Sequence, residues 1–196
     1  MARRTIEIQP GSSGEDCSLY GDAGSVNTAH PTGNLAIRGS SNKIHFLIRF
    51  PLTTIPDGAI IISANLKLYC TSHWAGQKLS IAPCSRAWTE AGATWNKYDG
   101  SNSWQTAGGL GANDKGSDFI TNQEASLGWN TFALTAAIIK SWKTGTNNGL
   151  IGYYSSGGNS NNDDAFSSSD NATASIRPIL EVTFDEPGGA FLLNFV

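Results

Sequence analysis

Three aromatic side chains stand in polar stretches of the sequence, where no buried face of a helix or strand requires them. Flat rings carried on loops are well suited to stacking on sugar rings, and loops carry much of the binding function of proteins. The three residues are Trp74, Tyr98 and Trp104. They predict a glycan-binding surface, and the alternative is that each ring covers the core beneath its own loop.

A second group of side chains has the chemistry to bind a metal ion. Asp163 and Asp164 follow two asparagines, and carboxylate and amide oxygens are the ligands that Ca²⁺ prefers. The spacing does not match the twelve-residue EF-hand loop, and clusters of Asn and Asp are ordinary turn formers. The segment is therefore predicted to be a turn, with calcium at Asp163 and Asp164 as the alternative and no other cofactor expected.

The carboxylates that a hydrolase needs are present but not diagnostic. Glu90 could act with Asp99 or Asp114, yet hydrolysis requires two carboxylates at a defined separation that a sequence does not reveal. Glu90 lies in the segment WTEAGATW, residues 88–95, whose tryptophans are expected to pack a corner of the fold. In that arrangement Glu90 holds its loop by accepting hydrogen bonds from backbone N–H groups.

The candidate catalytic bases lie in unrelated settings. They are His30 before a proline, His45 on the outward face of a predicted strand, and His73 in a loop. His45 is expected to be solvated. The sequence has no nucleophile elbow, no phosphate-binding glycine loop and no zinc-protease motif. The protein is therefore predicted not to be an enzyme.

Composition narrows the choice of partners. The 196 residues carry a net charge of −3, so no basic stripe is available for nucleic acid. No apolar run approaches the roughly 20 residues that cross a bilayer, and no membrane span is predicted. Residues 1–4 are basic, but the apolar core of a signal peptide does not follow them. The three cysteines cannot all pair with one another, and thiols are favoured over a disulfide framework.

Two segments alternate apolar and polar residues and organise the fold. Residues 43–50 and 60–71 each follow the two-residue period of a strand with one buried face, and Pro56-Asp57-Gly58 forms a turn between them. They are expected to form a hairpin-like pair. The inward residues of the second segment are predicted to be Ile60, Ile62, Ala64, Leu66, Leu68 and Cys70.

The remaining elements are short. Further strands are predicted at residues 5–8, 17–20, 34–38, 78–84, 129–134, 149–154, 165–169 and 179–184. One helix is predicted at about 135–143, and the polar, aperiodic segment 96–127 is the expected location of a binding site. About ten strands predict an all-β fold, a two-sheet antiparallel sandwich of jelly-roll type, with a barrel as the alternative.

Several short motifs in a fixed order resemble a known family. They are FLIRFPL, IPDGAIIISANLKLY, WTEAGATWN, GWNTFALT, NNGLIGY, AFSSSD and RPILEVTF. Together they resemble the DNRLRE-type β-sandwich domains that are grouped with carbohydrate-binding modules, over residues of about 16–184. The resemblance implies a non-catalytic jelly roll of the kind that is attached to secreted polysaccharide-degrading enzymes and occurs in surface proteins and phage structural proteins.

An apolar tail follows the predicted single domain of residues 1–186. Residues 187–196 begin with a Pro-Gly-Gly joint, and exposing the apolar side chains beyond it is costly. Those side chains are Phe191, Leu192, Leu193, Phe195 and Val196. The tail is predicted to dock on a partner by strand addition, and the alternative is that it completes a sheet of its own domain.

Two functions are predicted. The first is a non-catalytic structural or binding module of a larger assembly, such as a phage virion decoration or tail-associated protein. The tail then anchors it to other protein subunits, in a homo- or hetero-oligomer at the surface of a virion or extracellular assembly, and its loops bind glycans. The alternative is a free carbohydrate-binding module that recognises polysaccharide through loop aromatics.

Overall fold

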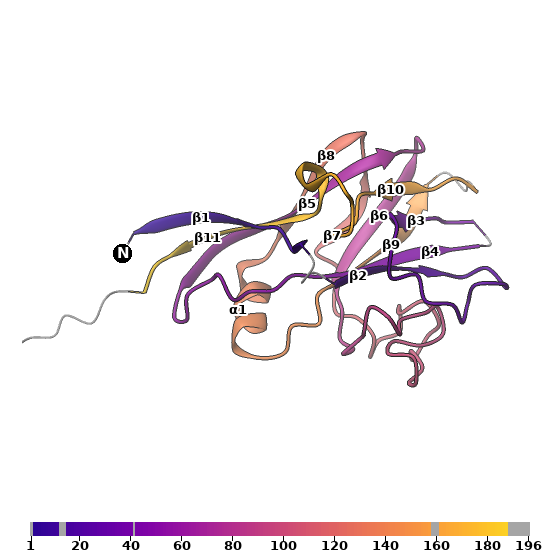
Figure 1. The fold of residues 1–196 in the computed structure, drawn as a ribbon, viewed down its shortest axis with the longest axis horizontal. Coiled ribbons are helices and arrows are strands. Elements are labelled where there is room, and N and C mark those ends of the chain that lie inside the picture. Colours follow the sequence, from indigo (N-terminus) through magenta and orange to yellow (C-terminus); the bar gives the residue numbers. More distant parts are fainter. Residues whose placement is uncertain (1, 12–14, 41, 158–160, 188–196) are drawn as a thin grey trace, which may run out of the picture.

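Two antiparallel β-sheets pack face to face in the computed structural model, which describes residues 2–11, 15–40, 42–157 and 161–187 (Figure 1). The first sheet runs in the order β1 (Arg3–Ile8), β11 (Ile179–Asp185), β5 (Ile60–Ser72), β10 (Asp164–Phe166) and β3 (Leu35–Ile37), and β8 (Gly128–Leu134) also pairs with β5. The second runs β2 (Glu15–Tyr20), β4 (Ile44–Arg49), β9 (Leu150–Gly157), β6 (Gln77–Pro83) and β7 (Ile120–Glu124). The predicted two-sheet sandwich is confirmed.

The core lies between the sheets and follows the predicted alternation. Leu66, Leu68 and Cys70 of β5 are buried, and they face Phe46 and Ile48 of β4 within one apolar cluster. Burying side chains of this size stabilises the fold by about 1.5–3 kcal/mol each. β4 and β5 therefore lie in opposite sheets, which corrects the expectation of a hairpin-like pair, since their alternating faces meet across the core.

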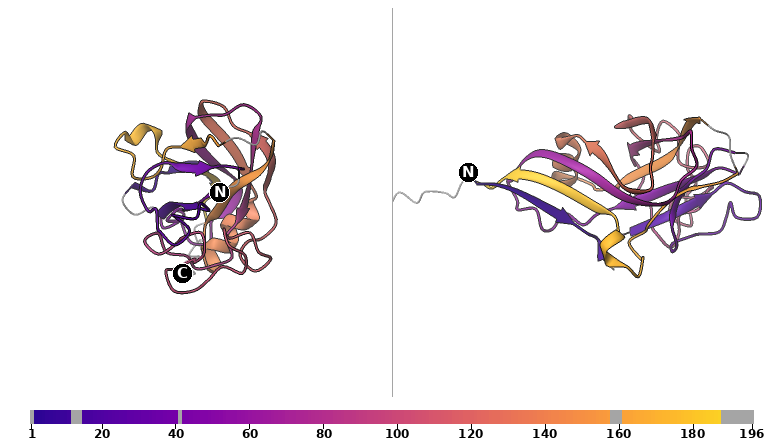
Figure 2. Two further views of the ribbon diagram at one scale, coloured as in Figure 1. Left: turned by 90° about the vertical axis from the view of Figure 1, so that its right-hand side faces the viewer. Right: turned by 90° about the horizontal axis from the view of Figure 1, so that it is seen from above.

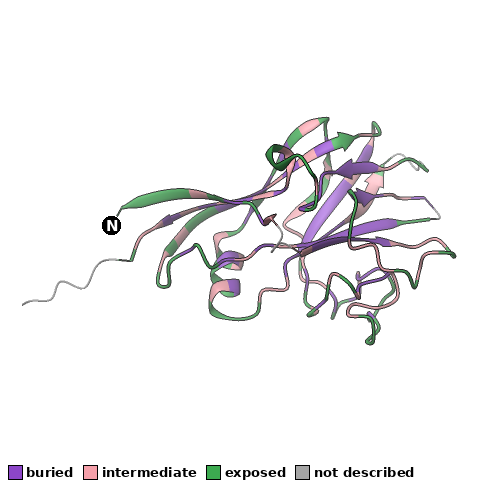
Figure 3. Cartoon of the chain, viewed as in Figure 1, coloured by how far each residue is buried: buried purple, intermediate pink, exposed green. Residues whose placement is uncertain are grey.

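A register shift changes the start of β5. Phe184 of β11 pairs with Ile61 after a bulge between Thr183 and Phe184, so Ile61 turns toward the core. The extra residue reverses the alternation, because side chains in a strand point to opposite faces in turn. Ile60 and Ile62, predicted to face inward, are consequently 49% and 40% exposed. Here β1, β11 and the first half of β5 extend beyond the rest of the sandwich (Figures 2 and 3).

The outer face of the second sheet is also buried. Residues 84–119 fold over β4 and β9, below them in Figure 1, and form a second apolar cluster around Trp88 and Trp104. His45 is therefore 2% exposed, and its Nδ1–H donates to the carbonyl oxygen of Gly108 at 2.8 Å. Burial lowers the pKa of His45 to about 4. The prediction of a solvated His45 is wrong because alternation within one strand says nothing about what covers it.

A single helix is seen in the described part of the chain besides a short 3₁₀ turn, η2 (Ala174–Ile176). It is α1 (Ala136–Thr144), close to the predicted span, and it buries Ile139 and Trp142 against the core. Thr135 precedes the helix in extended conformation but makes no capping hydrogen bond with its side chain. No helix among the described residues is long and apolar enough to span a membrane.

Asp114 anchors the cover over the second sheet. Its buried carboxylate accepts backbone N–H groups from Gln105, Thr106 and Gly111 at 2.9–3.2 Å, and it pairs with Arg86 at 3.0 Å. Burial raises the pKa of Asp114, but these hydrogen bonds outweigh burial and leave its pKa below 3.8. The carboxylate thus accepts hydrogen bonds from backbone N–H groups that, in a strand, would be bonded to a neighbouring strand.

Replacing Asp114 by Ala should destabilise the protein by about 3 kcal/mol, because three backbone N–H groups and the Arg86 guanidinium lose a buried, charged acceptor. The folded-state pKa is depressed, so the stabilisation is present above the unfolded pKa of about 3.9 and is lost as pH falls through the folded pKa. Urea unfolding at neutral and acidic pH measures both effects. An equal loss of stability at both pH values would contradict the electrostatic part of this account.

Candidate functional site

Two of the six tryptophans are exposed, and both lie at one end of β5. Trp74 is 47% exposed and Trp129 is 42% exposed, whereas Trp88, Trp104 and Trp142 are buried. Trp129 of β8 pairs with Tyr69, and Trp74 follows two residues after β5 ends. Burial of aromatic surface drives the folding of loops and cores. Rings that remain exposed on a folded surface are therefore candidates for binding.

The first part of the site is an end pocket around Trp74. It has a volume of ≈ 590 Å³ and is lined by Arg38, Ser72, His73, Trp74, Asn161, Asn162, Asp163 and Ala165. One wall is a fork in which the guanidinium of Arg38 bonds both oxygens of Asp163, at 2.5 and 3.0 Å. This geometry holds both side chains in place, because bidentate pairing fixes the plane of each group.

Asp164 holds the backbone of Trp74 at the end pocket. Its buried Oδ1 accepts the backbone N–H of Trp74 at 2.6 Å and lies 3.2 Å from His73 Nδ1. Burial raises the pKa of Asp164, and the Trp74 N–H and His73 oppose that rise. Asp163 and Asp164 thus have different partners, so the structure uses both carboxylates to build the pocket. Calcium at these two residues stays a prediction.

The second part of the site is a face groove on the outer surface of the first sheet. Its volume is ≈ 370 Å³, and its lining is Glu7, Lys67, Trp129, Thr131, Ser175 and Ile179. The Trp129 ring stands nearly perpendicular to Tyr69, with 5.5 Å between the ring centroids. Such edge-to-face pairs stabilise a fixed ring orientation. The groove therefore offers an aromatic surface whose orientation is set before any ligand arrives.

The one cation of the face groove is paired with two carboxylates. Lys67 Nζ contacts Glu7 at 2.8 Å and Glu181 at 2.6 Å, and Asn65 donates to the second oxygen of Glu181 at 2.9 Å. The hydrogen bonds to Lys67 and Asn65 lower the pKa of Glu181. Asn65 and Lys67 alternate with core residues along β5, and Glu181 of β11 and Glu7 of β1 lie beside them because the strands pair in register Asn65–Glu181–Glu7. They supply donors and acceptors of the kind that sugar hydroxyl groups need.

A short turn presents Trp129. Asn130, which is buried, donates to the carbonyl oxygens of Ser126 and Gly128 and accepts the N–H of Ser126, all within 2.7–2.9 Å. The amide nitrogen of Asn130 thus donates both of its hydrogens to the turn, and its oxygen accepts a hydrogen bond from the same turn. Leu127 at the tip is 69% exposed. The turn before β8 thus fixes the backbone that presents Trp129 to the groove, and Leu127 does not line the groove.

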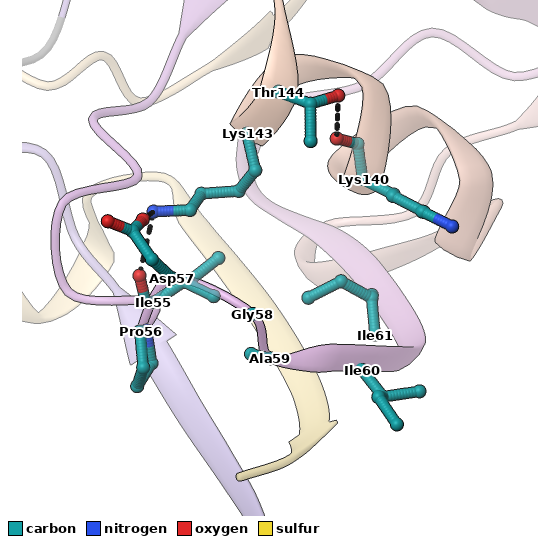
Figure 4. Close-up of a pocket in the computed structure, with 10 residues that line it drawn as sticks. All are labelled: Ile55, Pro56, Asp57, Gly58, Ala59, Ile60, Ile61, Lys140, Lys143 and Thr144. Carbon is teal, nitrogen blue, oxygen red and sulfur yellow. Dashed lines mark hydrogen bonds and ion pairs between the residues drawn. The ribbon is translucent and has the colours of Figure 1, made fainter. Parts of the chain in front are cut away.

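A third pocket lies apart from these surfaces, between α1 and the turn before β5 (Figure 4). Its volume is ≈ 610 Å³, with apolar walls from Ile55, Pro56 and the start of β5. Lys143 reaches across it and bonds the Ile55 carbonyl and Asp57, both at 2.8 Å. No aromatic residue is among the described residues that line this pocket.

Comparison with known families agrees with this combination of a sandwich fold and exposed rings. A model of carbohydrate-binding module family 96 matches residues 20–184, which is most of the chain. The chain belongs to carbohydrate-binding module family 96. A search of curated proteins finds no match to it. The match confirms a domain like a carbohydrate-binding module, whereas the narrower DNRLRE-type assignment is not confirmed.

The residues predicted for sugar binding are only partly brought together in this family 96 module. Trp104 is 5% exposed and its indole N–H donates to the carbonyl oxygen of Thr94 at 2.9 Å, so the expectation of an exposed ring is wrong for Trp104. Tyr98 is half-buried and packs against Trp104, at 5.5 Å between centroids. Segment 96–127, expected to hold the site, instead covers the second sheet and ends in β7. Trp74 alone of the three remains exposed.

Trp129 was missing from the predicted site, although a signal for it exists. Phe132 and Leu134 face the core, so alternation along β8 places Asn130 on their side and Trp129 on the opposite face. A tryptophan on the outward face of a strand is unusual enough to suggest binding. The predicted docking residues of the tail, Phe191 to Val196, lie outside the described residues.

The carboxylates considered for hydrolysis each bind backbone groups in the module. Asp99 accepts N–H groups of Ser101 and Asn102, and Asp114 holds the loop described above. Glu90 accepts the backbone N–H of Asp16 at 3.0 Å. The prediction that Glu90 bonds backbone N–H groups is confirmed, with the difference that its partner belongs to β2.

Replacing Asp164 by Ala should lower the stability of the module by about 1–3 kcal/mol, because it leaves the Trp74 N–H without its buried acceptor. Asp164→Asn is the matched control, since it keeps an acceptor oxygen and removes only a charge that burial already disfavours. Thermal unfolding measures both, and fluorescence reports the freedom of the Trp74 ring. Equal stability of the Ala variant and the parent would show that Asp164 does not hold the pocket.

Proposed function

We propose that this module binds a polysaccharide chain across the end pocket and the face groove, with Trp74 and Trp129 as its two stacking surfaces. The observation that carries the proposal is the exposure of these two rings at the same end of β5. Trp74 follows Tyr69 by five positions in the sequence, which is at most about 17 Å along an extended chain. A chain of several sugars is long enough to contact both rings over a separation of this size.

The charge of the site favours an uncharged polysaccharide. Arg38 is paired with Asp163, and Lys67 is paired with Glu7 and Glu181, so neither cation is left to bind an anionic sugar. The whole chain is also negative, with a net charge of −3. An acidic polysaccharide would have to compete with these carboxylates and with the overall potential. Neutral sugars need only hydroxyl partners and apolar ring faces, and both are present here.

The proposed role is binding without catalysis. Glu90, Asp99 and Asp114 each accept backbone N–H groups, which supports a structural use of these side chains. The family match favours carbohydrate recognition and gives no support to the role of a virion decoration protein. A free module and a module within a larger protein would use the same surface.

Trp74→Ala and Trp129→Ala should each weaken polysaccharide binding by roughly tenfold or more, because each removes an aromatic surface worth about 1.5–3 kcal/mol when buried. Both rings are exposed, so the unfolding temperature should change little. Affinity electrophoresis in gels that contain neutral polysaccharides, followed by calorimetry on the best ligand, measures the effect.

Leu127→Ala is the matched control for these two variants, since Leu127 is more exposed than either ring but has no aromatic face. Its affinity should stay within about twofold of the parent. Binding that survives loss of both tryptophans would show that the site lies elsewhere. Retention by polygalacturonate alone would contradict the choice of an uncharged ligand.

We infer a second role in self-assembly from the position of Pro187. Its ring lies beside Gly58 at the edge of the pocket between α1 and β5, 3.8 Å from where a side chain at Gly58 would begin. The residues that follow in the sequence are apolar, and so are the pocket walls. The proposed arrangement places the tail of one copy in the pocket of a second copy.

Removing residues 187–196 should abolish this self-association, and Ile60→Ser in the pocket lining should weaken it, because both remove apolar contact area. Ile62→Ser is the control, since Ile62 is similarly exposed but does not line the pocket. Sedimentation velocity over a range of concentrations measures the effect. An unchanged sedimentation coefficient after truncation would rule out docking by the tail.

A further inference from the structure

Three carboxylates from distant parts of the sequence converge away from the tryptophan site. Asp16 lies in β2, Glu90 in the loop after β6, and Asp170 just beyond β10. One oxygen from each lies within 4.8 Å of the other two. Asp16 is buried, Glu90 is half-buried and Asp170 is exposed, so the cluster opens to solvent on the Asp170 side.

Among the described residues, no cation forms an ion pair with this cluster, and Arg49 interacts with Glu90 only over a longer distance. Asp16, Glu90 and Asp170 have no ion pair with any described Lys, Arg or His within 4.0 Å. Arg49 is occupied by Glu15 and by the face of Trp88, 5.0 Å from its ring centroid. Burying like charges together without a counter-charge is costly. The arrangement therefore requires either proton uptake or a bound cation.

An unpartnered hydroxyl faces the same cluster. Ser169 is 2% exposed, and its Oγ has no hydrogen-bond partner of acceptable geometry. Its backbone N–H donates to Asp16 Oδ2 at 2.7 Å, and the hydroxyl faces that carboxylate closely enough to influence its pKa. Buried polar atoms almost always have a partner. A buried oxygen without one, beside three carboxylates, is the feature that a coordinated cation explains.

We propose that Asp16, Glu90 and Asp170, with Ser169 Oγ, bind a calcium ion that joins β2 to the loops after β6 and β10. The donors are all oxygen, which favours a hard cation and excludes the sulfur and imidazole ligands typical of zinc sites. Ca²⁺ accepts irregular sets of six to eight oxygens, whereas Mg²⁺ keeps several waters in a strict octahedron. The buried Asp16 and Ser169 leave little room for such a water shell.

The ion would stabilise a region that β-sheet pairing does not join. Glu90 belongs to the segment that packs Trp88 over the second sheet, and Asp170 follows a strand of the first sheet. Only one direct bond, from the Asp16 N–H to Glu90, links β2 to that segment through these carboxylates. A cation shared by the three would connect both sheets at this edge. The site is independent of the tryptophan surface and of the proposed glycan binding.

The test uses the full chain, first freed of metal with a chelator. Addition of Ca²⁺ to about 100 times its Kd should raise the unfolding temperature by roughly 5–10 °C, and excess chelator should reverse the shift. Tb³⁺, a luminescent substitute for Ca²⁺, should bind with one saturable phase that Ca²⁺ displaces. Displacement by Mg²⁺ at the same concentration as Ca²⁺ would overturn the choice of calcium.

Asp170→Asn is the decisive variant, because Asp170 is exposed and its replacement leaves the core intact. It should weaken Tb³⁺ and Ca²⁺ binding at least tenfold. Asp163→Asn tests the alternative location near Trp74, and Asp57→Asn tests a fully exposed carboxylate that pairs only with Lys143. Both should bind like the parent. Absence of saturable binding by the parent, or equal losses in all three variants, would overturn the proposal.

Discussion

The pairing register of β5 is the constraint on which the rest of the molecule depends. This strand of thirteen residues pairs with β11 over its first half, with β8 over its middle and with β10 at its end. Its inward residues build the core, and two of its outward residues, Lys67 and Tyr69, lie at the face groove. A shift by one residue would exchange the two sets. One register thus determines both the stability of the fold and the geometry of the site.

The two sheets use their outer faces differently. The outer face of the second sheet is covered by residues 84–119, which bury Trp88, Trp104 and His45 in a second cluster. Polar groups inside this cover must find partners there, and Asp114 supplies them for three backbone N–H groups. Within the described ranges, no comparable segment covers Trp129 and Lys67 on the first sheet. The tryptophans of the cover therefore contribute to folding, and those of the open face remain available to a ligand.

Local patterns predicted most of the fold. Alternation located β4, β5 and β11, helical spacing located α1, and the motif around Trp88 identified a packed corner, because each depends on residues close in sequence. The failures depend on distant contacts. The bulge that turns Ile61 inward is set by β11, and the burial of His45 is set by Gly108 in the covering loop. The alternation within β5 does not reveal the bulge in its pairing with β11, and the alternation within β4 does not reveal that a distant loop covers His45.

The contrast between local patterns and distant contacts also explains which residues of the candidate site could be predicted. Trp74 and Trp104 both stand in polar loops, and only the finished fold shows that one ring is exposed while the other donates its N–H to Thr94. Trp129 could be found from the alternation of β8, which places it opposite Phe132, but its value as a binding residue depends on the absence of a cover. Exposure of an aromatic ring is a property of the whole sandwich. A sequence therefore identifies rings that are able to bind, and the packing of distant segments selects which of them do.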